Sequence, residues 1–150
     1  MRIEKQLFLF GLLILLVTGG IFSNSTKNSE ASHAQSDVIV DLVELTIRTD
    51  EKEPREKLSF TVRKIAHFVE FAVLGICTGG FAMSLSVLKK RSFGMMGPAI
   101  CLVVAGTDEF IQSFTDRTSS LKDVALDMCG SATGLLLVAI VVLMWKKRKA

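Results

Sequence analysis

Residues 65–88 read IAHFVEFAVLGICTGGFAMSLSVL, and this stretch decides the fold class. After Glu70 it carries no charged side chain up to its end. An α-helix rises about 1.5 Å per residue, so roughly 20 apolar residues cross the hydrocarbon core of a bilayer. The stretch is therefore predicted to form a transmembrane helix.

Three further apolar stretches surround it, at about residues 7–22, 94–112 and 123–145. Together the four stretches predict an all-α integral membrane protein, a bundle of four transmembrane helices in a single domain over residues 1–150. The apolar share of 49% argues against an ordinary soluble enzyme domain and against a disordered tail. The three cysteines lie inside apolar runs, so we expect packing residues rather than disulfides.

The first apolar stretch is short enough to be a signal peptide. No cleavage pattern of the A-x-A type follows Phe22 closely. We therefore expect an uncleaved anchor, with a signal peptide as the alternative.

The charges outside the apolar stretches predict the orientation of the chain. Four spans place both termini on one side, where the charged residues are Arg2, Lys5, residues 89–91 and the basic tail 146–150, against the single acidic Glu4. The other side receives the loop 23–61, in which acidic residues outnumber basic ones. The positive-inside rule then predicts that both termini are cytoplasmic. The net charge of +3 is too small to indicate nucleic-acid binding.

The outer loop contains one helical pattern. Ser36 can cap a helix whose apolar side chains, Val38, Ile39, Leu42, Val43 and Leu45, lie opposite Asp37, Asp41 and Glu44. An interfacial helix or a cap over the bundle is the simplest interpretation, and a partner-binding helix is the alternative.

The polar residues of the four spans all lie at the predicted outer ends. They are Lys64, His67 and Glu70 in the second span, Asp108, Glu109 and Gln112 in the third, Arg117 in the next loop, and Asp123 and Asp127 in the fourth. A charge at the bilayer centre costs about 2.5–3.5 kcal/mol on insertion scales, so such residues face the bundle interior or a water-filled cavity. We therefore expect them to converge on one extracytoplasmic polar site.

Two glycines extend this site in the prediction. Gly130 and Gly134 lie within about 60° of Asp127 on a helical wheel, so they could line a groove that takes an acyl chain. Both also fit the small-xxx-small pattern of close helix packing, as do Gly75 and Gly79. A homo-oligomer formed through these small-residue faces is a further alternative.

The residue types allow several kinds of chemistry. His67 and Glu70 lie one turn apart, so a carboxylate could orient an imidazole that acts as a general base. Asp108 and Glu109 should repel each other or recruit Arg117, Lys64 or a cation. These observations make His67, Glu70, Asp108 and Glu109 the candidate catalytic residues. No HxxxH or HExxH spacing occurs, so the sequence assigns no metal and no cofactor, and a divalent cation at the acidic cluster stays an alternative.

At these residues the chain resembles the VanZ-like family of bacterial membrane proteins. The matching segments are RKIAHFVEF at 63–71 and DEFIQSF at 108–114, followed by Arg117, Asp123-Val124, Gly130 and Gly134. Thr115-Asp116 replaces the family's usual Pro-Gly, and Asp127 stands where the family usually has Asn. The resemblance implies a multi-pass protein of the bacterial cytoplasmic membrane, in a family whose namesake is linked to teicoplanin resistance.

Three functions are compatible with these features. The first is a protein that binds or shields a membrane lipid, a lipid-linked cell-wall precursor or a lipoglycopeptide, and so contributes to glycopeptide resistance. The second is an intramembrane enzyme that acts on a lipid head group with His67 and Glu70 as its acid–base pair. The third is a structural protein whose charges only close the outer end of the bundle. A transporter is disfavoured, because the cytoplasmic halves of the spans offer no polar path.

Overall fold

The computed structural model describes residues 2–26, 55–115 and 120–148. Within them the chain forms four helices, α1 (Ile3–Ser25), α3 (Arg55–Lys89), α4 (Met96–Gln112) and α5 (Leu121–Lys147), and no strand. This confirms the predicted all-α bundle. The helix expected from Ser36 onwards and the candidate residue Arg117 lie outside the described residues.

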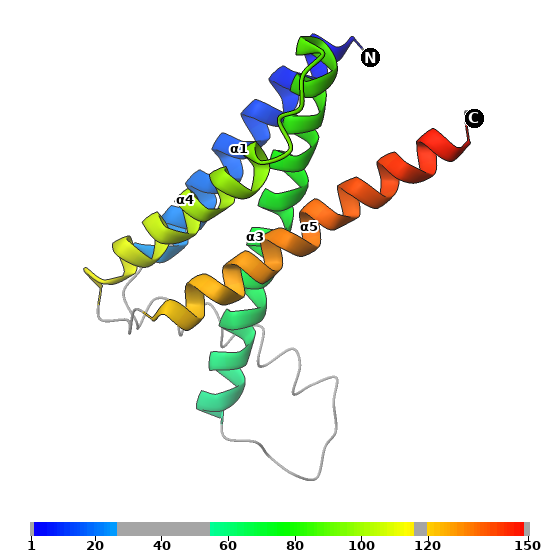
Figure 1. The fold of residues 1–150 in the computed structure, drawn as a ribbon. Coiled ribbons are helices and arrows are strands. Elements are labelled where there is room, and N and C mark those ends of the chain that lie inside the picture. Colours follow the sequence, from blue (N-terminus) through cyan, green and yellow to red (C-terminus); the bar gives the residue numbers. More distant parts are fainter. Residues whose placement is uncertain (1, 27–54, 116–119, 149–150) are drawn as a thin grey trace.

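Three of these helices are long and apolar enough to cross a membrane, namely Ile3–Ser25, Lys57–Lys89 and Leu121–Lys147. The fourth helix, α4, has 17 residues. At about 1.5 Å per residue it measures roughly 25 Å, slightly less than the roughly 30 Å of a bilayer core. It runs antiparallel to α3 and α5 (Figure 1), and its residues Cys101, Val104 and Ala105 are buried in the bundle. A span at this position stays a prediction.

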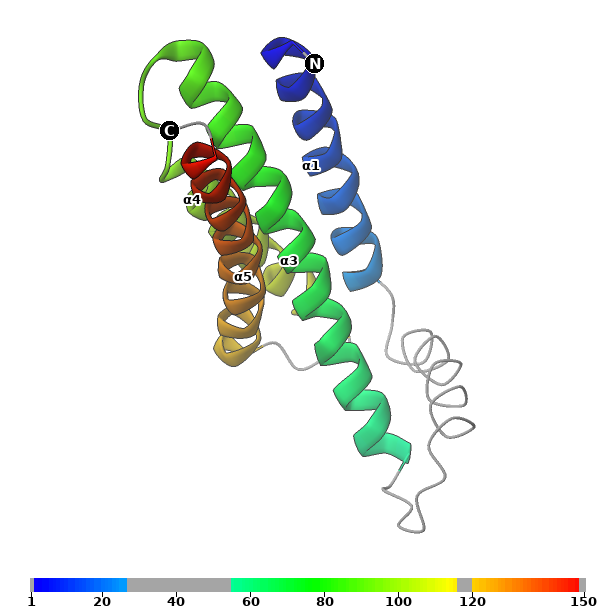
Figure 2. The same ribbon diagram turned by 90° about the vertical axis from the view of Figure 1, so that its right-hand side faces the viewer.

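Helices α3 and α4 each pack against the other three, and α3 is the central element because its packing against α5 and α1 is the most extensive in the bundle. Figure 2 shows α1 and α5 on different sides of it. The apolar core forms where α3 meets α1 and α4, around Ile21, Phe71, Leu74, Cys101 and Ala105. Large apolar side chains also point outward, among them Phe8, Leu15, Val103 and Leu136, as expected for surfaces that face lipid.

The glycines of α3 and α5 hold these two helices close together. A Cβ atom at Gly130 would overlap the carbonyl oxygen of Phe68, and one at Gly134 would overlap that of Ala72. A Cβ atom at Gly75 would likewise overlap the backbone of Ser131. The backbone of α3 therefore fills the space in front of Gly130 and Gly134, and the groove expected there for an acyl chain is absent. The small-xxx-small packing, which is the more common role of such glycines and which the sequence predicts here, occurs within the chain.

The helices extend further than the apolar stretches do. Helix α1 continues past residue 22 to Ser25, and α5 continues into the predicted basic tail as far as Lys147. Helix α3 begins at Arg55 instead of near residue 65, so residues 55–61 are helical and not part of a loop. These residues project beyond the ends of the other helices (Figure 1). Helices α4 and α5 agree with their expected bounds to within two residues at each end.

The two ends of the bundle differ in character. Because consecutive helices alternate in direction, the N-terminus and the C-terminal end of α5 lie at one end of the bundle (Figure 1). We call this the basic end, since Arg2, Lys5, Lys89, Lys147 and Arg148 lie there. The opposite end, where α1 and α4 finish and α5 begins, is the polar end.

Packing also distinguishes the three cysteines. All three are free thiols, as the sequence predicts. Cys77 and Cys101 are buried packing residues, whereas Cys129 is exposed, so the prediction of a packing role is wrong for that residue.

Candidate functional site

Polar side chains from all four helices meet at the polar end. This polar cluster consists of Asn24 and Ser25 of α1, Lys64, His67 and Glu70 of α3, Asp108, Glu109 and Gln112 of α4, and Asp123 and Asp127 of α5. The sequence places each group at the matching end of its helix, and the alternating helix directions bring these ends together. The predicted convergence of the polar residues therefore occurs for every described candidate except Gly130 and Gly134, which pack against α3.

Asp108 is the most deeply buried carboxylate of the cluster, with none of its surface exposed. Its Oδ1 atom accepts a hydrogen bond of 2.5 Å from Ser25 Oγ, and its Oδ2 atom accepts one of 2.7 Å from Gln112 Nε2. Gln112 Nε2 also donates to Ser25 Oγ at 3.4 Å. A carboxylate held at both oxygens has a fixed orientation, as a binding or catalytic group requires.

His67 lies between two carboxylates. Its Nδ1 atom is 3.9 Å from Glu70 Oε2 and 3.9 Å from Asp108 Oδ2. Glu70 is held from the other side, since its Oε1 atom accepts a hydrogen bond of 2.5 Å from Asn24 Nδ2. The predicted meeting of His67 and Glu70 is observed, but 3.9 Å is longer than a hydrogen bond. Glu70 is therefore not the sole carboxylate available to orient the imidazole.

Asp127 brings a third helix to this point. Only 2% of its surface is exposed. One of its carboxylate oxygens, a ring nitrogen of His67 and a carboxylate oxygen of Asp108 all lie within 4.8 Å of one another. Three side chains that are common metal ligands thus converge from α3, α4 and α5.

The more exposed side of the cluster carries an ion pair. Lys64 Nζ contacts Asp123 Oδ1, and the two side chains are 30% and 22% exposed. Lys64 also lies over the ring of Phe60, 5.1 Å from its centroid. Asp123 is in the first turn of α5, where a negative charge is favoured by the helix dipole.

Glu109 points away from its neighbour Asp108. Its Oε1 atom accepts a hydrogen bond from the backbone N–H of Ser120, the N-cap residue of α5. The two adjacent carboxylates therefore do not form the pair that the sequence suggested, and Lys64 binds Asp123 rather than either of them. Glu109 thus helps to hold the start of α5, and its role as a candidate catalytic residue stays a prediction.

Sequence reasoning missed Asn24 and Ser25. The apolar run of the first span ends at Phe22, so both residues were assigned to the outer loop. They belong to the last turn of α1, and each holds a carboxylate of the cluster. Their location at the predicted outer end of a span, level with the other polar residues, was the signal that could have identified them.

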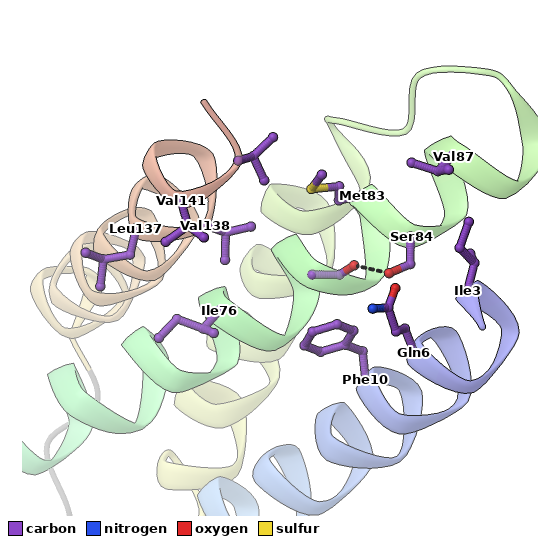
Figure 3. Close-up of a pocket in the computed structure, with 12 residues that line it drawn as sticks. Ile3, Gln6, Phe10, Ile76, Met83, Ser84, Val87, Leu137, Val138 and Val141 are labelled. Atoms are coloured by element: carbon purple, nitrogen blue, oxygen red, sulfur yellow. Dashed lines mark hydrogen bonds between the residues drawn. The ribbon is translucent and has the colours of Figure 1, made fainter. Parts of the chain in front are cut away.

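The bundle also has a cavity away from the polar cluster. It lies between α1, α3 and α5 towards the basic end, with a volume of about 450 Å³ (Figure 3). Its lining is apolar apart from Gln6 and Ser84, and Ser84 Oγ donates its hydrogen bond to the carbonyl of Gly80 at 2.9 Å. No lining residue is an acid or a base, so the chemistry expected of this protein resides in the polar cluster.

One of three comparisons with known proteins gave a match. A search of curated proteins and a search of solved structures each gave no match. The model of the VanZ/LLP1 family matches residues 10–143, which include all of α3 and α4, most of α1 and α5, and every residue of the polar cluster. This chain therefore belongs to the VanZ/LLP1 family.

Proposed function

We propose that this membrane protein binds the head group of a lipid or lipid-linked molecule in its polar cluster, on the extracytoplasmic side of the bacterial cytoplasmic membrane. Membership of the VanZ/LLP1 family and the long apolar helices support a membrane protein. The location and the ligand are our proposal.

The distribution of charge supports the extracytoplasmic location. Arg2, Lys5, Lys89 and the lysines at the end of α5 gather at the basic end. Basic residues flanking membrane spans are enriched on the cytoplasmic side, because the positive-inside rule sets orientation. The polar end would then face outward, where lipid-linked wall precursors and glycopeptides are found.

The observation that carries the proposal is a gradient of exposure through the cluster. Side-chain exposure falls from 30% at Lys64 and 28% at Glu70 to 13% at His67 and 0% at Asp108. A network whose only role was to close the end of the bundle would not need a series of charged side chains that runs from the surface to a fully buried carboxylate. Partly exposed charges at the rim and fixed, buried acceptors below them suit a polar head group that enters from outside.

The narrower form of the proposal concerns the ligand. A lipid anchors its acyl chains in the bilayer, so its head group is presented at the depth where a polar cluster at helix ends can reach it. A lipid-linked cell-wall precursor or a lipoglycopeptide has the same arrangement of apolar tail and polar head. Sequestering such a molecule would contribute to teicoplanin resistance.

A binding measurement tests the proposal directly. Purified protein in nanodiscs would be titrated with teicoplanin and, separately, with a lipid-linked wall precursor. We expect saturable binding of at least one of them, lost in Asp108→Asn and His67→Gln. Glu4→Gln, an exposed change at the basic end, is the matched control and should bind normally. Absence of saturable binding for both probes by folded protein would refute this ligand class.

Complementation separates function from folding. A strain that lacks the protein would receive wild-type chain or alanine variants at His67, Glu70 and Asp123, with teicoplanin susceptibility and membrane abundance measured together. Loss of the phenotype at normal abundance is the expected result. Loss of abundance in every variant would instead indicate that the charges only stabilise the bundle.

The position of His67 favours one second candidate, an intramembrane enzyme that modifies a lipid head group. Its Nδ1 atom is equally far from two carboxylates, so either Glu70 or Asp108 could stabilise the imidazolium after a small side-chain movement. Incubation of the protein with lipid extract, followed by mass spectrometry, should then reveal a product that His67→Gln does not form. Equal product from His67→Gln would exclude this role.

A further inference from the structure

We propose that His67, Asp108 and Asp127 bind a divalent transition-metal cation, with Zn²⁺ as the best match to this ligand set. The inference deepens the proposed function, since the cation would occupy the same polar cluster. It needs no lipid, however, and can be tested without one.

The spacing of the three side chains fits a shared cation. Their ligand atoms lie within 4.8 Å of one another. By the geometry of an equilateral triangle, three such atoms are at most about 2.8 Å from a common centre, against the roughly 2.0–2.2 Å of zinc bonds to imidazole nitrogen and carboxylate oxygen. Side-chain shifts of well under 1 Å would close the site around an ion.

Asp127 provides an independent reason to expect a cation. It is 2% exposed, and it forms no hydrogen bond or ion pair with another described residue. Its carboxylate nevertheless points towards His67 and Asp108, where a second buried carboxylate already lies. Burying a carboxylate without a partner is strongly unfavourable, and a cation between the groups would remove that cost.

Lys64, the lysine of the polar cluster, pairs with a different carboxylate from those of Asp108 and Asp127. Lys64 contacts Asp123, one helical turn before Asp127 and closer to the surface. Its Nζ atom is therefore engaged with a carboxylate that is not one of the three proposed metal ligands.

Neighbouring groups hold Asp108 in the manner of an outer coordination shell. Ser25 Oγ donates to its Oδ1 atom and Gln112 Nε2 donates to its Oδ2 atom. In metal sites such hydrogen bonds orient the ligating carboxylate and contribute to affinity. Each carboxylate oxygen has further lone pairs, so these hydrogen bonds leave room for a metal bond.

The ligand types select the cation. Zn²⁺ binds both imidazole nitrogen and carboxylate oxygen and needs only four ligands, whereas Ca²⁺ takes six to eight oxygen ligands. Three protein ligands also leave one tetrahedral position open, as in zinc sites that receive a water or a substrate oxygen. An oxygen of a lipid head group could occupy that position.

The test measures Zn²⁺ binding to full-length protein in detergent by isothermal titration calorimetry and by metal analysis after dialysis. The background carries Cys129→Ser and His33→Ala, which remove an exposed thiol and the second histidine as competing ligands. The protein is purified with an affinity tag that contains no histidine, because a histidine tag would itself bind Zn²⁺. We expect about one Zn²⁺ per chain, with the three ligand side chains as its donors.

Variants identify the ligands. Asp127→Asn, Asp108→Asn and His67→Gln should each weaken binding by about 100-fold or more, since even outer-shell changes cost about 10–100-fold. Glu4→Gln is the control, because it removes one carboxylate charge at the basic end, away from the polar cluster, and should alter the affinity by less than about threefold. Binding that Asp127→Asn leaves unchanged would overturn the proposal.

A second measurement does not depend on the stability of any variant. X-ray absorption at the zinc edge of the wild-type protein should show nitrogen and oxygen ligands with the scattering pattern of one imidazole. Sulfur ligation, or no Zn²⁺ retained by folded protein, would overturn the site.

Lipid titration of protein that has been supplied with Zn²⁺ separates the two proposals. Binding of Zn²⁺ by protein that binds neither lipid probe supports the metal site and refutes the proposed function. Binding of a lipid probe by protein that takes up no Zn²⁺ refutes the metal site alone.

Discussion

Ser25, the last residue of α1, donates a hydrogen bond of 2.5 Å to Asp108 of α4, which lies 83 positions later in the chain. Both side chains are fully buried. The contact connects the end of the first helix to the most buried carboxylate of the polar cluster. It therefore couples the packing of α1 to the orientation of a proposed ligand-binding group.

Removal of this hydrogen bond should destabilise the bundle. In Ser25→Ala a buried carboxylate oxygen loses its donor, which should lower the free energy of unfolding by about 1–3 kcal/mol. Thermal unfolding in detergent, followed by circular dichroism, measures the effect. Ser23→Ala removes a hydroxyl from an exposed position on the same turn and serves as control. Equal melting temperatures for the two variants would contradict the assigned role of Ser25.

The neighbours Asp108 and Glu109 should respond differently to substitution. Glu109→Ala removes the acceptor for the Ser120 N–H and should lower the free energy of unfolding by about 1–3 kcal/mol, whereas Glu109→Gln keeps an acceptor and should cost less. Asp108→Asn should instead abolish ligand binding while membrane abundance remains. Parallel assays of abundance and binding distinguish the two patterns. Loss of binding in Glu109→Gln at normal stability would show that Glu109 also contacts the ligand.

Close contact between α3 and α5 should make Gly134 intolerant of a side chain. In Gly134→Ala the new methyl group meets the backbone of Ala72 and Ile76, so the helices must separate. Overpacking of this kind costs about 1–3 kcal/mol. The control is Gly106→Ala on α4, because a Cβ atom there meets nothing within 4 Å. Similar thermal stability of the two variants would mean that α3 and α5 are not packed as described.

The sequence predicted the helices well because length and hydropathy are local properties. A run of apolar residues long enough for a bilayer indicates a helix wherever its neighbours lie. The predicted helix ends were less accurate, since Asn24, Ser25 and most of residues 55–61 are polar and still helical. Helix α1 extends to Ser25 because Asn24 and Ser25 form hydrogen bonds with carboxylates of the polar cluster, and not because these residues are apolar.

Partners across helices could not be read from the sequence. Spacing along one helix suggested the pairs His67–Glu70 and Asp108–Glu109, which involve near neighbours only. The observed contacts, Lys64 with Asp123 and His67 with Asp108 and Asp127, depend on which helices are adjacent and on how each is rotated. Hydropathy determines neither the neighbours nor the rotation of a helix, so most residues of the site were predictable and their pairing across helices was not.

The orientation of the bundle is open to a labelling experiment. In a Cys129→Ser background the remaining thiols, Cys77 and Cys101, are buried. Single cysteines would be introduced as Ser23→Cys at the polar end and Ser92→Cys at the basic end, both exposed positions.

A maleimide that cannot cross membranes should label Ser23→Cys in intact cells and Ser92→Cys only after permeabilisation. The reason is that the basic residues flanking Ser92 are expected to stay in the cytoplasm during insertion. The reverse labelling would place the polar cluster on the cytoplasmic side. A ligand would then have to come from the inner leaflet, and sequestration of an external lipoglycopeptide would be refuted.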